Sequence, residues 1–124
     1  MATRVVLIVA GIVGLLAGLD YLFATESAIL SFNIGDATLP AMLFARATGA
    51  AILAMGVINI LAAADAGSPA LRAVLIGNVV AHTASLFGDF SGGIGANPIF
   101  WVAVVIHVAF IAAFGYLLAT SETG

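Results

Sequence analysis

Long apolar runs, separated by short polar stretches, dominate the chain. Four of them have the length that a helix needs to cross a membrane, about 20 residues, and they lie at about Val5–Ala24, Pro40–Ala64, Leu71–Gly88 and Pro98–Ala119. Each run is apolar on all sides, whereas the strands of a membrane barrel alternate between apolar and polar positions. The pattern predicts an all-α fold, in which residues 1–124 form a single domain, a four-transmembrane-helix bundle of a polytopic membrane protein.

The stretches between the runs carry residues that begin helices or make turns. Pro40 and Pro98 stand at predicted helix starts, where the missing N–H of proline does no harm. Thr25 begins a stretch that predicts a short helix at the membrane surface, capped by the Thr25 hydroxyl. Asn33–Asp36 and the glycine-rich segment Gly92–Gly95 predict turns.

Composition agrees with a membrane protein. Of 124 residues, 64% are hydrophobic and 7% are charged, whereas soluble domains carry about 25% charged residues. Cysteine is absent from the sequence, so disulfide and thiolate chemistry are excluded. The net charge of −3 comes without any basic run, which argues against a nucleic acid partner. The partner that the composition predicts is the lipid bilayer.

Arginine placement predicts the orientation, because basic residues concentrate in cytoplasmic connections. Arg4 precedes the first run, and Arg72 borders the second connection, Asp65–Ala70. The first connection, Thr25–Leu39, and the third, Asp89–Asn97, carry acidic residues and no basic ones. We therefore expect a multi-pass protein of the cell membrane with both termini cytoplasmic.

Small residues recur at helical spacing in the first two runs. Gly14 and Gly18 form a GxxxG pattern that Ala10 extends backward, and Ala45 and Gly49 repeat the spacing in the second run. Small residues at this spacing let helix backbones approach closely in lipid. The pattern favours packing within the bundle, and the alternative is contact between copies in a homo-oligomer.

Beyond the first turn of each run, one Asp, Arg or His lies in every run: Asp20, Arg46, His82 and His107. A charged side chain at the centre of a membrane helix costs at least about 2.5–3.5 kcal/mol, so such residues usually face the bundle interior. With the orientation above, all four lie in the outer half of the membrane or near its midplane. They predict one shared polar site that borders a cavity beneath the outer surface.

The third run adds a polar stripe. Asn78, His82, Ser85 and Asp89 follow one another at helical spacing and share one face. We expect this face to point to the core of the bundle, with Asn78 hydrogen-bonded to His82. The predicted ligand-binding residues are Asp20, Arg46, Asn78, His82, Ser85 and His107. The sequence assigns no catalytic residue, no metal site and no cofactor.

The same residues also have purely structural interpretations. Asp20 and Arg46 would neutralise each other as an ion pair, and Asp20 alone would reach the lipid headgroups. His82 and Asn78 would form a hydrogen bond that joins helices, and His107 would be a packed histidine. None of these interpretations requires a ligand.

Three functions use this site. The first is a binding or accessory protein that holds a quinone-like or lipid-like molecule or docks to a larger membrane complex. The second is a redox protein in which His82 and His107 ligate a haem iron. The third is transport of a small solute by an oligomer, since the inner half of one chain has few polar residues for a path.

The segment Phe44–Asn59, which contains Arg46-Ala-Thr-Gly49 at the start of a helix rich in small residues, resembles the second helix of small DoxX-like bacterial membrane proteins. Those proteins have four helices and glycines in the first one, here Gly11, Gly14 and Gly18. The resemblance implies a four-helix membrane fold. Some members are linked with oxidoreductase or quinone-associated systems, which implies a quinone-like ligand, and the family pattern does not account for His107.

Overall fold

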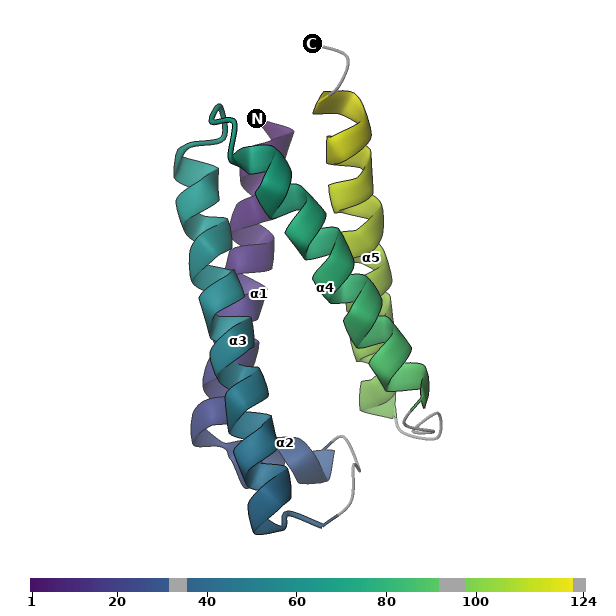
Figure 1. Ribbon diagram of the computed structural model, residues 1–124. Coiled ribbons are helices and arrows are strands. Elements are labelled where there is room, and N and C mark those ends of the chain that lie inside the picture. The colour runs from purple at the N-terminus through teal and green to yellow at the C-terminus, as the bar shows by residue number, and fades with distance from the viewer. Residues whose placement is uncertain (32–35, 92–97, 122–124) are drawn as a thin grey trace.

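The computed structural model describes residues 1–31, 36–91 and 98–121, and this part of the chain folds into five α-helices (Figure 1). They are α1 (Ala2–Phe23), α2 (Thr25–Ser31), α3 (Leu39–Ala64), α4 (Leu71–Ser91) and α5 (Pro98–Ser121). All but α2 are long and apolar enough to cross a membrane. The all-α fold and the four predicted long helices are therefore confirmed.

Prolines and polar caps set the helix starts. Pro98 is the first residue of α5, and Pro40 lies in the first turn of α3, as predicted. The Thr38 hydroxyl accepts a hydrogen bond from the Ala41 N–H at 3.4 Å and so caps α3. The turns predicted from Asn33 and from the glycines at 92, 93 and 95 fall outside the described residues.

The prediction for Thr25 is half right. The short helix α2 does begin at this residue. However, the Thr25 hydroxyl does not cap α2, because it donates back to the carbonyl oxygen of Tyr21 at 2.7 Å in the last turn of α1. Thr25 therefore ties the end of α1 to the start of α2, and its side chain is buried, at 4% exposed.

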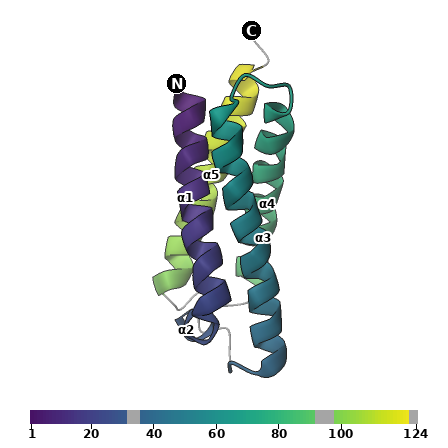
Figure 2. The ribbon, with the colours of Figure 1, turned by 90° about the vertical axis from the view of Figure 1, so that its left-hand side faces the viewer.

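The four long helices form two antiparallel pairs. α1 packs along α3 and α4 packs along α5, whereas contacts between the pairs are fewer (Figures 1 and 2). The start of α1, the end of α5 and the α3–α4 turn lie together at one end, which we call the terminal end. At the opposite end, which carries α2, the two pairs diverge in Figure 1.

Glycines explain why α1 and α3 pack so closely. A Cβ atom added at Gly18 would lie 2.6 Å from the backbone nitrogen of Leu53, and one added at Gly56 would lie 2.7 Å from that of Leu15. A Cβ added at Gly14 would lie 3.0 Å from the Gly56 Cα. These distances confirm that the GxxxG pattern serves packing inside the chain.

The two pairs meet in an apolar core at the terminal end. Its members come from all four long helices: Leu7, Ala10, Ala63, Leu75, Phe114 and Leu117. Large apolar side chains also cover the outward faces, and Phe44 and Phe87 are 77% and 76% exposed. In water such a surface would be unfavourable, whereas lipid chains would solvate it.

Candidate functional site

A cavity of about 260 Å³ lies between the two helix pairs. All four long helices line it, mostly with small and aliphatic side chains. Its polar residues are Asn59, Asn78, His82, Ser85 and His107. An engineered apolar cavity of about 150 Å³ holds a benzene ring, so this cavity has room for a ring with several substituents.

A pair of buried asparagines joins the two helix pairs beside the cavity. The Asn59 Nδ2 donates to Asn78 Oδ1 at 3.0 Å, and Asn78 Nδ2 donates to Asn59 Oδ1 at 2.7 Å. Asn78 Nδ2 also donates to the Val74 carbonyl at 2.9 Å. The side chains are only 3% and 1% exposed, so these bonds satisfy amides that have no access to water.

This pairing corrects the predicted bond between Asn78 and His82. Asn78 has two donor hydrogens, and the Asn59 amide and the Val74 carbonyl engage them. The Asn78 oxygen accepts from Asn59. The amide is therefore used in holding α3 to α4, and it does not orient His82.

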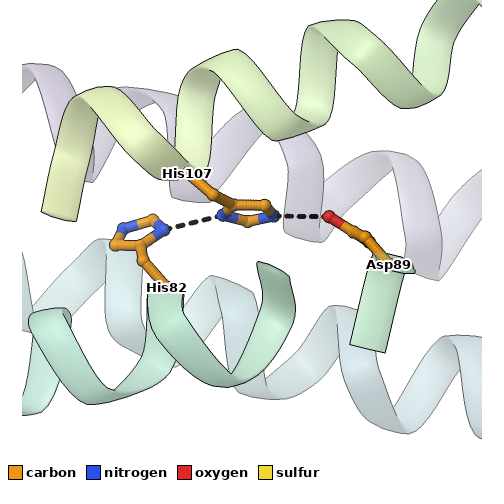
Figure 3. A network of polar contacts seen from close by, with 3 residues as sticks. All are labelled: His82, Asp89 and His107. Carbon is orange, nitrogen blue, oxygen red and sulfur yellow. Dashed lines mark hydrogen bonds and ion pairs between the residues drawn. The ribbon is translucent and has the colours of Figure 1, made fainter. Parts of the chain in front are cut away.

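His82 of α4 and His107 of α5 face each other across the second helix pair (Figure 3). Their Nδ1 atoms are 2.9 Å apart, the distance of a hydrogen bond between a protonated and a bare ring nitrogen. The His82 ring also stacks on Phe110, with ring centroids 4.9 Å apart and planes 23° apart. Phe114 lies beyond at 6.1 Å, so the aromatic rings fix the plane of the His82 imidazole.

Asp89 extends the contact toward the α2 end. Its Oδ2 atom lies 3.6 Å from His107 Nε2, on the side of the ring away from His82 (Figure 3). This separation is an electrostatic contact, since it exceeds hydrogen-bond length. Asp89 Oδ2 is buried, and no described residue donates a hydrogen bond to it. Asp89, His107 and His82 thus stand in series.

When both imidazoles are neutral, the series favours one protonation pattern. A carboxylate only accepts, so the His107 Nε2 that faces Asp89 carries a hydrogen. His107 Nδ1 is then bare and accepts from His82 Nδ1–H, which leaves His82 Nε2 bare. In this pattern His82, which lines the cavity, keeps one bare ring nitrogen that can accept a hydrogen bond or a proton.

The structure brings together four of the six residues predicted to bind a ligand. Asn78, His82, Ser85 and His107 all line the cavity. The stripe on the third run does face the bundle interior, as its periodicity predicts. Asp20 and Arg46 are not among the lining residues, so the prediction that all the ionisable residues border one cavity is wrong for these two.

Arg46 lies on a different face of α3. Ile52 lines the cavity, and Arg46 precedes it by six residues. At 3.6 residues per turn, the two side chains are about 120° apart around the helix axis. Arg46 Nε donates to the Thr25 hydroxyl at 3.3 Å, and its side chain is exposed in an open hollow beside α2. Within the described chain, no carboxylate lies within ion-pair distance of the guanidinium, so the predicted pair with Asp20 is not formed.

Asp20 follows the cavity stripe of α1 but lies beyond the cavity. Val13 and Ala17 line the cavity, and Asp20 comes one turn after Ala17, at an exposed position. The two helix pairs diverge toward this end in Figure 1. The charge remains at the edge of the bundle, where polar headgroups would solvate it.

The histidine geometry does not fit a haem iron. Two bonds from imidazole nitrogens to a metal, each about 2.0 Å long, would set the nitrogens about 4 Å apart on opposite sides of the iron. The facing nitrogens of His82 and His107 are 2.9 Å apart and bond each other. Among the described residues, no group of three or more His, Cys, Asp or Glu is arranged to hold a metal ion.

Two members of the site were not among the predicted ligand-binding residues. Asn59 is a polar residue within the second apolar run. It lies about as far before the second connection as Asn78 lies after it, so two antiparallel helices would bring the two amides to the same depth. Asp89 was on the predicted stripe, but its contact with His107 depends on how α4 and α5 pack.

No family model, curated protein or solved structure matches this chain. The resemblance to DoxX-like proteins therefore stays a prediction from one motif and the number of helices.

Proposed function

We propose that this chain is a small integral membrane binding protein whose central cavity holds an apolar molecule with a hydrogen-bonding ring, such as a quinone. The observation that carries the proposal is a cavity of about 260 Å³ whose apolar wall is interrupted by His82, His107 and Ser85. Ligand sites combine a mostly apolar lining with a few polar groups that orient the ligand. The spacing of the two histidines argues against the haem alternative.

The size and polarity of the cavity favour a ring over a lipid headgroup. None of the described residues that line it is an arginine or a lysine, and these are the groups that bind phosphate. His82 Nε2 is a bare acceptor and Ser85 offers a hydroxyl, which suit the oxygens of a quinone or hydroquinone.

We further propose that the bundle lies in the cell membrane with both termini cytoplasmic. Four helices of sufficient length and apolarity support insertion. Arg4 and the Arg72 region lie at the terminal end, which the distribution of basic residues assigns to the cytoplasm. In this arrangement a ligand would enter the cavity from the surrounding lipid. Docking to a larger membrane complex and assembly into oligomers, the condition for a transport function, remain predictions of the sequence.

The test is binding of decylubiquinone to the purified protein in lipid nanodiscs. Quinone retained after gel filtration is extracted and measured by absorbance, with empty nanodiscs as the blank. We expect saturable binding of one quinone per chain. Retention that equals the blank, or that rises linearly with added quinone, would overturn the proposal.

Two alanines, one turn apart on α4, give a matched comparison. Ala81 lines the cavity, whereas Ala84 is exposed and does not. Ala81→Leu should fill the cavity and weaken binding at least tenfold, and Ala84→Leu should leave it unchanged. His82→Phe should also weaken binding, because it removes the acceptor while keeping a ring of similar size. Equal losses at Ala81 and Ala84 would mean that the cavity is not the binding site.

A further inference from the structure

We propose that His82, His107 and Asp89 form a proton relay, which takes the hydroxyl proton of a phenol or hydroquinone bound in the cavity and delivers it to Asp89. The inference rests on the proposed function, because it requires a ligand in the cavity. It goes further in assigning a direction of proton movement and an end point. The juxtaposition that carries it is the series of contacts from the cavity to the edge of the bundle (Figure 3).

The contacts have the order that a relay needs. His82 lines the cavity, and its Nδ1 lies 2.9 Å from His107 Nδ1. His107 Nε2 lies 3.6 Å from Asp89 Oδ2. Proton transfer needs about 2.6–3.2 Å, and hydrogen bonds at reactive sites are often longer before the ligand binds. Closure of the helix pair by a few tenths of an ångström would complete the series.

Each step moves one proton and no electrons. The ligand O–H bond breaks, and an N–H bond forms at His82 Nε2. The His82 Nδ1–H bond breaks, and an N–H bond forms at His107 Nδ1. The His107 Nε2–H bond breaks, and an O–H bond forms at Asp89 Oδ2. The ligand becomes an oxyanion and Asp89 becomes neutral, so the total charge is unchanged, and the same steps in reverse return the proton.

Asp89 suits the end of the relay. Its Oδ2 atom is buried and has no hydrogen-bond donor among the described residues, so it has acceptor capacity that the fold leaves unused. The side chain as a whole is 26% exposed and lies in the last turn of α4, close to the surface. The other ionisable groups toward this end are Asp20 and Tyr21 of α1, Glu26 of α2, Asp36 before α3 and Arg46 of α3. Of these, Tyr21 is the one on which the charge of Asp89 acts.

The rings around His82 support the same function. Phe110 and Phe114 stack on its imidazole and prevent it from turning away from His107. The intervening imidazoles need only exchange which nitrogen carries the hydrogen, which requires no ring movement. The buried Asp89 oxygen without a donor is the feature that a histidine pair serving only to join two helices would not need.

The probe is 4-nitrophenol, because its absorption band shifts into the visible when the hydroxyl loses its proton. The protein in nanodiscs is saturated with the probe at a pH where the free probe is mostly protonated. Retained probe is measured after extraction, and its ionised fraction is read from the spectrum before extraction. We expect the bound probe to be mostly ionised in the unaltered protein.

Asp89→Asn is the deciding variant, since an amide keeps the shape but does not take the proton. We expect the same amount of bound probe and an ionised fraction at least tenfold lower. Tyr21→Phe is the control and should leave the ionised fraction unchanged. An equal ionised fraction in the unaltered protein and in Asp89→Asn would overturn the relay while leaving the binding site intact. Failure of the probe to bind would count against the proposed function.

A measurement without any ligand keeps the relay testable in that case. Nitrogen NMR of the labelled protein distinguishes the two neutral forms of histidine. We expect His82 to carry its hydrogen on Nδ1 and His107 to carry its hydrogen on Nε2. In Asp89→Leu, the preference of His107 for a hydrogen on Nε2 should disappear. Two histidines that both carry hydrogen on Nε2, unaffected by Asp89→Leu, would show that the series does not exist.

Discussion

Replacing Gly18 with alanine puts a methyl group where α1 and α3 leave no room for one. The added Cβ would lie 2.6 Å from the backbone nitrogen of Leu53 and 2.8 Å from the carbonyl oxygen of Gly49. Ordinary contact begins at 3.4 Å, so the helices must separate by about 0.8 Å (3.4 − 2.6) at this point. Because the obstructing atoms belong to the backbone, no side chain can rotate away to relieve the contact.

The size of the effect follows from two opposing terms. Overpacking of a filled interface costs about 1–3 kcal/mol, and alanine regains about 1 kcal/mol over glycine within a helix. We expect Gly18→Ala to lower the free energy of unfolding by up to about 2 kcal/mol. Gly77 of α4 is the matched control, because a Cβ added there meets nothing within 4 Å. Gly77→Ala should therefore raise stability by up to about 1 kcal/mol.

The assay is unfolding in mixed micelles, with helix content followed by circular dichroism as the mole fraction of SDS increases. Gly18→Ala should unfold at a lower SDS fraction than the unaltered protein, and Gly77→Ala at the same or a higher fraction. If both variants shift in the same direction by the same amount, the close contact between the α1 and α3 backbones is refuted.

Three further predictions test other contacts. Asn59→Ala and Asn78→Ala should each destabilise the fold by about 1–2 kcal/mol in the same assay. A double-mutant cycle should give a coupling energy of about 0.6–1.7 kcal/mol between them, and strictly additive effects of the two substitutions would contradict the paired amides. Thr25→Val should lower the free energy of unfolding by about 1 kcal/mol, because it removes the hydrogen bond to the Tyr21 carbonyl and the acceptor for Arg46 Nε–H. An unchanged free energy of unfolding would mean that these two bonds do not stabilise the fold. Ser27→Cys should react with an impermeant thiol reagent in intact cells, whereas Ala70→Cys should react only after lysis; the reverse pattern would invert the orientation.

The helices and their closest contact were predictable because the physical demands on them are local. A membrane helix needs about 20 apolar residues, and the runs that begin at Pro40 and Pro98 meet this demand within one chain segment. The Gly14 and Gly18 spacing likewise marks one side of a single helix. The polar stripe of α4 was predicted for the same reason, since periodicity alone places His82 on the inner face.

The partners of the polar residues were less predictable, because they depend on how the helices pair. The cost of a charge in lipid indicates that Arg46 needs polar surroundings, but it does not distinguish the bundle interior from a hollow beside α2. The glycines of α1 and α3 hold these helices together, and the second pair diverges from them at the α2 end. Asp20 lies beyond the cavity and Arg46 lies on another face of α3, whereas Asn78 bonds Asn59 on the neighbouring helix.

The most direct test of the central proposal is photolabelling of the protein in nanodiscs with an azido-substituted benzoquinone, followed by peptide mapping. We expect labels on cavity residues such as Met55 and Phe110, and we expect excess decylubiquinone to abolish them. Exposed residues on the outward faces, such as Phe44 and Phe87, should carry only the background label of free quinone in the lipid. Labels spread over the outward faces, unchanged by the competitor and absent from Met55 and Phe110, would contradict the proposal that the cavity binds a quinone.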